Sequence, residues 1–295
     1  MATRRQFLKG LLATMLAGLF VPIYGFFIEP SLRLRVRRWQ VRHADWPEER
    51  PLRIAVLSDL HMGEPFVTRA RLRQIVARTN ALGADLTVVL GDLVAGHHYV
   101  SGEIPVTDTS KILSDLSAPL GVYAIMGNHD WWEDPIAQRR RKGPIIAQRA
   151  LEAEGITVLE NSALALPNGV WLAGLASQHA LPRKDGGFDG VDDLAGTMAQ
   201  VPDDEPCVLL IHEPDIFPEV PGRVALTLAG HTHGGQVRLF GWSPVVPSRF
   251  GNRFAYGPVT EEGRHLVVSG GIGCSILPVR FGVVPEITLV ELARA

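Results

Sequence analysis

The feature that most constrains the fold is a repeated alternation of short apolar runs with segments of helical spacing. The runs at 53–58, 85–90 and 121–126 are short and apolar enough to be buried strands. Helical periodicity follows the first two over 68–82 and 107–116. Such an alternation predicts βα units that build a mostly parallel sheet.

The second half of the chain is richer in strand patterns. Residues 156–175 hold three short strand patterns separated by Asn-Ser and Asn-Gly turn signals. Apolar strands return at 208–211 and 225–229, and two more follow in the Gly- and Pro-rich last third. No linker divides the body, so we expect one α/β domain in which two mixed sheets pack together and are flanked by helices.

Polar clusters follow five of these apolar runs directly. They are Ser58-Asp59-Leu60-His61, Gly91-Asp92, Gly127-Asn128-His129-Asp130, Ile211-His212-Glu213 and Gly230-His231-Thr232-His233. Functional residues commonly stand at the carboxyl ends of strands in α/β sheets. The clusters supply Asp, His and Asn but no Cys, which suits Mn, Fe or Zn in a reactive centre better than a structural zinc site.

The spacing within the clusters supports a shared site. Asp59 and His61 stand two residues apart, as do His231 and His233, and in an extended segment such pairs point to one side. Glycines before Asp92, Asn128 and His231 permit tight turns. A single Asp after a strand is usually a turn or cap residue, and a single His is usually structural. Five such clusters in one chain favour a common metal centre.

Composition narrows the classes of function. The net charge of −2 offers no electrostatic case for nucleic-acid binding. The two cysteines, Cys207 and Cys274, form neither a zinc-type pair nor a disulfide framework.

The first 31 residues have the pattern of a leader. Arg4 and Arg5 precede Phe7-Leu8-Lys9 and an uncharged run over 10–28, which favours a twin-arginine export signal over the plain basic flank of an anchor. The run has close to the roughly 20 residues of a membrane helix, and no small-x-small cleavage site follows it. We therefore expect an uncleaved membrane anchor over 1–31. The arginines after it favour a cytoplasmic flank, although their alternation with Leu32, Leu34 and Val36 indicates a folded strand.

The five clusters, in this order, resemble the calcineurin-like metallophosphoesterase superfamily, whose pattern is D-x-H, G-D, G-N-H-[DE], H and G-H-x-H. The ending over 271–286 is similar to a bacterial branch of membrane-associated phosphoesterases with twin-arginine leaders. The resemblance implies a four-layer α/β/β/α sandwich over 32–295. It also implies export by the twin-arginine machinery to the bacterial inner membrane, with the catalytic domain periplasmic or extracellular.

The resemblance further implies a role for each cluster residue. Asp59, His61 and His233 would bind a first divalent metal ion, Asn128, His212 and His231 a second, and Asp92 would bridge the two. His129 would contact the phosphoryl group or protonate the leaving oxygen, and Asp130 would orient His129. Ala95 stands where some family members have a further Asp, which disfavours the protein-phosphatase branch.

Two such ions, Mn, Fe or Zn, would generate a bridging hydroxide for in-line attack on a phosphodiester or pyrophosphate bond. A lipid-linked substrate is one candidate, because aromatic residues stand in loops near the motifs: Trp131, Trp132, Phe240, Trp242 and Phe250. The alternative for them is ordinary packing. His97 and His98 are candidates for substrate contact, whereas His179 is expected to be structural.

Three other functions stay open. A UDP-2,3-diacylglucosamine pyrophosphatase of lipid A synthesis acts in the cytoplasm, which conflicts with export. A nuclease is disfavoured by the slight acidity of the chain. A non-catalytic metal-binding protein would not need His129.

Overall fold

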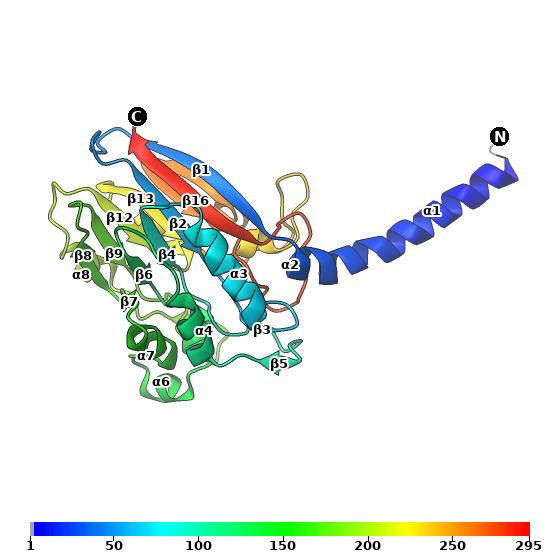
Figure 1. Cartoon of the computed structure of the whole chain (residues 1–295), viewed down its shortest axis with the longest axis horizontal. Helices are drawn as coiled ribbons and strands as arrows, with labels where there is room; N and C mark the ends of the chain where they lie inside the picture. The colour runs from blue at the N-terminus through cyan, green and yellow to red at the C-terminus, as the bar shows by residue number, and fades with distance from the viewer. Residues whose placement is uncertain (1–2) are drawn as a thin grey trace.

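Two six-stranded β-sheets form the centre of the protein, as Figure 1 shows for the computed structural model, which describes residues 3–295. The first sheet has the order β1 (Arg35–His43), β16 (Glu286–Arg294), β2 (Leu52–Leu57), β4 (Leu86–Val89), β6 (Val122–Ala124) and β7 (Thr157–Val158). Strands β2, β4, β6 and β7 are parallel, as the βα alternation predicts. Strand β16 is antiparallel to β2, and β1 pairs parallel with β16 at the edge.

The second sheet is built from the β-rich half of the chain. Its order is β14 (Gly257–Glu261), β15 (Arg264–Val268), β13 (Val224–Ala229), β12 (Cys207–Leu210), β9 (Trp171–Gly174) and β8 (Ser162–Ala165). The inner four strands are parallel and the two edge strands are antiparallel to their neighbours. Two small antiparallel pairs, β3 (Gly63–Glu64) with β5 (Gly102–Glu103) and β10 (Leu181–Pro182) with β11 (Phe188–Asp189), lie outside these sheets.

The two sheets pack face to face through apolar side chains. Ile54 and Val88 of the first sheet share one buried cluster with Leu210 and Leu226 of the second. Helices α3 (Arg69–Asn80), α4 (Val106–Leu113) and α7 (Ile146–Ala153) cover the outer face of the first sheet. The outer face of the second sheet is covered by α8 (Leu194–Met198) and the 3-10 turn η2 (Pro214–Glu219). The expected four-layer α/β/β/α sandwich is thus confirmed. The remaining short helical segments are α5 (Asn128–Trp132), α6 (Pro135–Arg140), η3 (His233–Gly235) and η4 (Gly251–Phe254).

The N-terminal segment is one helical rod that joins the body at its end. Helix α1 (Arg4–Ile23) continues through a π-helical turn, η1 (Tyr24–Ile28), into α2 (Glu29–Leu32). The amide of Arg280 donates to the carbonyl of Gly25 at 2.9 Å, and both Glu29 and Pro30 are buried. The rod therefore packs on the body before the boundary predicted at residue 31. Within residues 3–295, no helix combines the length and apolar character that crossing a bilayer requires.

Candidate metal centre

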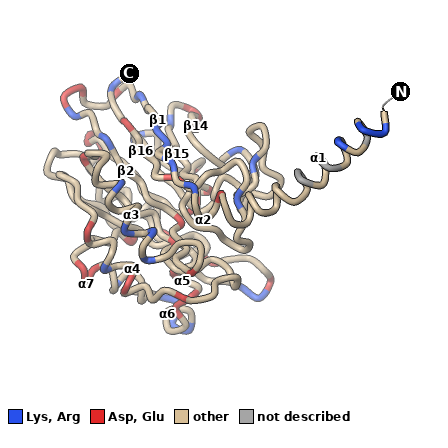
Figure 2. Tube along the Cα trace, turned by 45° about the vertical axis from the view of Figure 1, so that its right-hand side comes forward, with Lys and Arg blue, Asp and Glu red and all other residues tan. Residues whose placement is uncertain are grey.

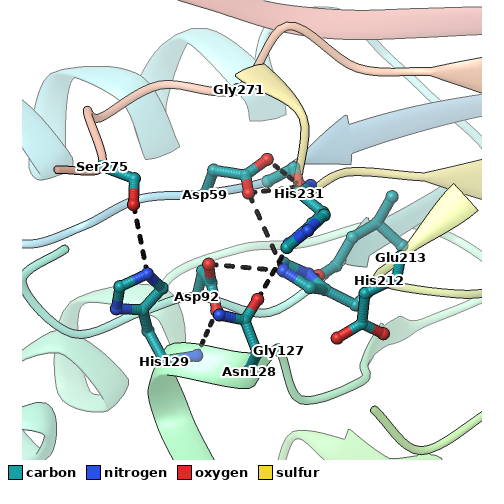
Figure 3. Close-up of polar contacts among 12 residues, drawn as sticks. Asp59, Asp92, Gly127, Asn128, His129, His212, Glu213, His231, Gly271 and Ser275 are labelled. Atoms are coloured by element: carbon teal, nitrogen blue, oxygen red, sulfur yellow. Dashed lines mark hydrogen bonds and ion pairs between the residues drawn. The ribbon is translucent and has the colours of Figure 1, made fainter. Parts of the chain in front are cut away.

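Loops from both sheets bring the seven predicted ligands together. Asp59 and His61 follow β2, Asp92 follows β4 and Asn128 begins α5 after β6, whereas His212 follows β12 and the pair His231 and His233 follows β13. Figure 3 shows five of these side chains pointing toward one centre from separate loops: Asp59, Asp92, Asn128, His212 and His231. All seven residues are buried. The carboxyl ends of strands from the two sheets meet at one edge, which is why residues so far apart in the chain converge.

Asp59, His61 and His233 form the first subsite. The Nε2 atoms of His61 and His233 are 3.1 Å apart, and His233 Nε2 lies 3.5 Å from Asp59 Oδ1. Their possible ligand atoms all lie within 4.8 Å of one another. This cluster therefore has the donor set of one divalent-metal site.

Asp92, Asn128, His212 and His231 form the second subsite. His212 Nε2 lies 3.3 Å from Asp92 Oδ2, and His231 Nδ1 lies 2.9 Å from Asn128 Oδ1. The same Asp92 Oδ2 is 3.5 Å from His61 Nε2 of the first subsite. A single carboxylate thus joins the two clusters, in the position expected for a bridging ligand.

Hydrogen bonds on the far side of two imidazoles define which nitrogen faces the centre. Nδ1 of His61 lies 3.0 Å from the carbonyl of Val94, and Nδ1 of His212 lies 2.6 Å from that of Leu90. Because a carbonyl only accepts, each Nδ1 carries a proton, and each Nε2 is the nitrogen turned toward the centre. His212 Nε2 is buried without a hydrogen-bond partner among the described residues. A divalent cation would satisfy that orphaned atom, so the residues fit a two-metal centre.

Burial keeps His61 and His231 in the neutral form that binds a metal ion. Desolvation lowers the pKa of His61 to about 3, and desolvation together with the neighbouring His212 lowers that of His231 to about 3. Both imidazoles are therefore neutral at pH 7, as metal binding requires.

The backbone at the ligands is strained. Asp59, His61, Asp92, His231 and His233 have φ values of 52°, 42°, 56°, 69° and 52°. Non-glycine residues rarely adopt this left-handed region, and such strain is concentrated at functional sites. Here it turns the side chains at the strand ends inward toward the centre.

Two of the glycines before the ligands leave room for close approach. A Cβ on Gly127 would lie 2.3 Å from Asp92 Oδ1, and a Cβ on Gly230 would lie 2.0 Å from Ser58 Oγ. Any side chain at these positions would displace the ligand loops, which supports the role assigned to them from sequence.

The role expected for Asp130 is wrong. Its carboxylate accepts hydrogen bonds from the backbone N–H groups of Asp92, Leu93 and Gly127, at 2.8, 2.8 and 3.0 Å. Asp130 therefore holds the loops of two ligands together and does not orient the His129 ring. That role came from the family resemblance, but in the first turn of α5 adjacent side chains point in different directions.

His129 is oriented by residues near the C terminus. Its backbone N–H donates to Asp92 Oδ1 at 2.9 Å, and its Nε2 lies 3.1 Å from Ser275 Oγ (Figure 3). The amide of Ser275 in turn donates to Gln236 Oε1 at 2.7 Å. Sequence reasoning missed Ser275 and Gln236, because neither belongs to a ligand-type pattern. Gln236 directly follows the Gly-rich end of the last cluster, which is the one signal that could have drawn attention to it.

A cavity of about 340 Å³ opens beside the centre. Its polar floor includes Asp92, Asn128 and His129, and its walls include the apolar side chains of Val245 and Ile276. No Lys or Arg is among the described residues that line it. The site therefore offers metal-ligand chemistry at the bottom and an apolar surface toward the mouth.

The aromatic residues predicted near the motifs divide into two groups. Trp132 lines the cavity, with its ring centroid 4.7 Å from that of His129, and Phe240 and Trp242 are exposed. Trp131 is buried in the core, and Phe250 packs on Phe254 at 5.0 Å, so for these two the packing alternative holds.

The remaining histidines also differ from expectation. His97 packs on Phe66, with 5.4 Å between ring centroids, and is not among the described residues that line the cavity; neither is His98. His179, expected to be structural, lies against His231 at 5.3 Å and groups with the buried Glu213. It comes from a loop with no ligand-type pattern, so the sequence carried no signal for it.

A double-sheet α/β/β/α fold with two adjoining His/Asp metal subsites defines a class of metal-dependent phosphoric ester hydrolases. The family model for calcineurin-like phosphoesterases matches residues 52–235, and the chain belongs to that family. It is 29% identical to metallophosphoesterase YkuE of Bacillus subtilis, over 98% of this chain and 97% of that protein. It is also 29% identical to phosphodiesterase YaeI of Escherichia coli, over 99% of this chain and 100% of the relative. The solved structure of a dimetal phosphatase from Danio rerio aligns with a TM-score of 0.40 and 14% identity, over 76% of this chain and 88% of that chain.

Proposed function

We propose that the protein hydrolyses a phosphodiester or pyrophosphate bond with the help of two divalent ions, drawn from Mn, Fe or Zn. The observation that carries the proposal is the position of Asp92, whose Oδ2 lies 3.5 Å from His61 Nε2 and 3.3 Å from His212 Nε2. One carboxylate shared by two ligand clusters is suited to a two-metal site. Two ions there would neutralise phosphate oxygens and supply a nucleophile at neutral pH.

The side chains around the centre divide the remaining work. The seven predicted ligands would bind the two cations. Asp130 fixes the loops of Asp92 and Asn128, because its carboxylate accepts hydrogen bonds from their backbone. His129 lines the cavity, and Ser275 lies within hydrogen-bond distance of its Nε2, which supports a role for His129 as proton donor to the leaving oxygen.

The cavity lining favours a phosphodiester over a monoester. A monoester dianion carries more charge than a diester and is usually held by Arg or Lys in addition to metals. The described residues that line this cavity include no such side chain, and Val245 and Ile276 offer an apolar wall to a second substituent. The same lining counts against a nuclease, which needs cations for the flanking phosphates. The name of the relative YaeI, a phosphodiesterase, agrees with this assignment. The apolar wall also supports a lipid-linked substrate.

We further propose that the N-terminal segment tethers the protein to the bacterial inner membrane after twin-arginine export, with the catalytic domain periplasmic or extracellular. The support is the Arg4-Arg5 pair at the start of α1, followed by a segment without Asp or Glu up to residue 28.

The test is the substrate profile of the full-length protein loaded with Mn, Fe or Zn in detergent. We expect bis-p-nitrophenyl phosphate to be hydrolysed at least about tenfold faster than p-nitrophenyl phosphate, since the chemistry and the lining favour one negative charge on the substrate. A preference for the monoester would overturn the substrate class. No turnover with any of the three metals would favour a non-catalytic metal-binding protein.

A further inference from the structure

Apolar side chains are unusually exposed at the cavity and on the loop that precedes its lining residues Pro244 and Val245. Trp242 is 59% exposed and Ile276 is 74% exposed, while Phe240 is fully exposed. Val245 and Leu277 are exposed as well. Single exposed apolar residues are ordinary, but a group of large ones beside a binding cavity marks an interaction surface. We name this group the apolar rim.

The loop that carries Phe240 is built to display it. The amides of Leu239 and Trp242 donate to each other's carbonyls, both at 2.9 Å, which closes a two-residue turn. Phe240 and Gly241 at its tip have φ values of 51° and 83°. This turn favours Asn-Gly, and a Phe in the left-handed region is strained. A strained aromatic side chain that packs on nothing indicates that its exposure serves a function.

The apolar rim is firmly attached to the metal centre. The hydroxyl of Ser243, next to Trp242, donates to the carbonyl of Gly234 at 2.7 Å, and Gly234 directly follows the ligand His233. The side chain of Gln236 donates to the carbonyl of Leu277 at 3.2 Å. Val245, Ile276 and Leu277 line the cavity and are also exposed at the protein surface. A partner that covers the rim would therefore contact the mouth of the site.

The N-terminal helical rod leaves the body beside the rim. Tyr24 contacts the ring of Phe281 at 5.8 Å, and Val237 forms backbone bridges with Phe281 and Gly282. Figure 1 shows α2 and the two loops of the gold and orange-red parts of the chain on the same side of the body. Phe20 and Phe27 of the rod are exposed, so the apolar surface continues along it.

Charge identifies the kind of partner. Arg4, Arg5 and Lys9 are exposed on α1, and no Asp or Glu occurs before Glu29. Figure 2 shows the same rod with basic residues and no acidic ones along α1. A basic, apolar helix beside an apolar rim complements an anionic phospholipid surface.

We propose that the apolar rim inserts into the interfacial region of an anionic phospholipid bilayer, together with the N-terminal rod. The mouth of the cavity then faces the membrane, and the substrate is an amphiphilic phosphoester whose apolar chain stays in the bilayer while its phosphate reaches the metal centre. This substrate class rests on the phosphodiesterase function proposed above, whereas the docking surface does not.

The experiment compares the full-length protein and its variants in vesicles of phosphatidylcholine and phosphatidylglycerol. The probes are hexadecyl p-nitrophenyl phosphate embedded in the vesicles and water-soluble bis-p-nitrophenyl phosphate. For Phe240→Ser we expect turnover of the embedded probe to fall about tenfold, while the soluble probe changes less than about twofold, because only the membrane contact is lost. Ile136→Ser, on α6, removes an exposed apolar side chain away from the rim, although a smaller and less exposed one, and is the control. It should leave both rates unchanged.

A second measurement, of fluorescence quenching, tests membrane contact independently of hydrolysis. The fluorescence of the wild type minus that of Trp242→Phe reports Trp242, and brominated phospholipid should quench this component. Equal rates for Phe240→Ser and wild type on the embedded probe, or no quenching, would overturn the docking surface. A dimer that Phe240→Ser dissociates, seen by light scattering, would assign the rim to a second copy of the chain instead. Quenching without hydrolysis of either probe would leave the surface standing and reject the proposed function.

Discussion

The imidazole Nε2 of His129 lies 3.1 Å from the hydroxyl oxygen of Ser275, 146 positions further along the chain. The Gly-rich segment near the C terminus therefore reaches the centre of the site. It holds His129, which lines the cavity and is not one of the seven predicted metal ligands.

Replacing Ser275 by Ala should affect substrates according to their leaving groups. A proton donor matters most when the leaving oxygen is basic, so we expect kcat to fall about tenfold for alkyl diesters and less than about threefold for p-nitrophenyl esters. A series of esters of rising leaving-group pKa measures this. Ser275→Thr keeps the hydroxyl and should restore part of the rate. An equal loss across the series would assign Ser275 a purely structural role.

His129→Ala should reduce kcat by about 10²- to 10⁴-fold, the usual contribution of a positioned acid or base. The metal content should stay close to that of the wild type, since the ligand set is intact. Elemental analysis of the purified variant measures it directly. Loss of both metals from this variant would show that His129 is a ligand.

Asp92→Ala should lower the metal content more than any other ligand substitution, because Asp92 contacts histidines of both subsites. We expect less than about one ion per chain after dialysis and no detectable hydrolysis. His212→Ala is the comparison, and it should deplete only the second subsite. If the two variants retain the same metal content, Asp92 does not join the subsites.

Phe240→Gly should make the protein more stable. Glycine adopts the φ of 51° at this position without strain, and the exposed Phe loses no packing. We expect the free energy of unfolding to rise by about 0.5–1 kcal/mol in chemical denaturation. Gly251, which already has a positive φ, gives the reverse control, since Gly251→Ala should destabilise. A loss of stability in Phe240→Gly would mean that the loop packs against the body in solution.

Glu160 should make stability depend on pH. Burial is the main cause that raises the pKa of Glu160 from 4.5 to about 8, and the nearby carboxylates of Asp130 and Glu213 raise it further. The folded protein thus binds this proton more tightly than the unfolded chain, so the contribution of Glu160 to stability is present below pH 4.5 and is lost as the pH rises to about 8. Between these pH values we expect the free energy of unfolding of the wild type to fall by about 1–3 kcal/mol relative to that of Glu160→Gln. Chemical denaturation at several pH values measures this difference. Glu154→Gln, at the exposed C-cap of α7, should show the wild-type dependence.

Local patterns were enough to predict the two-sheet fold and the class of enzyme. The apolar runs before Asp59 and Asp92 are strands because such runs stay buried in any α/β sheet, and the observed β2 and β4 lie within one residue of the expected bounds. The pairs Asp59/His61 and His231/His233 do reach the centre, but not in the extended geometry that their spacing predicted, because all four residues have positive φ.

Local sequence patterns did not predict the long-range contacts. The placement of β16 between β1 and β2, the partners of Asp130 and the approach of Ser275 to His129 join residues that are far apart in the chain or point away from their neighbours. The exposure of Phe240 could not be predicted from the sequence either. An aromatic residue in a loop is buried or exposed according to what the rest of the chain places beside it. Periodicity reports which way a side chain points within its own element, whereas its distant neighbours depend on the path of the whole chain.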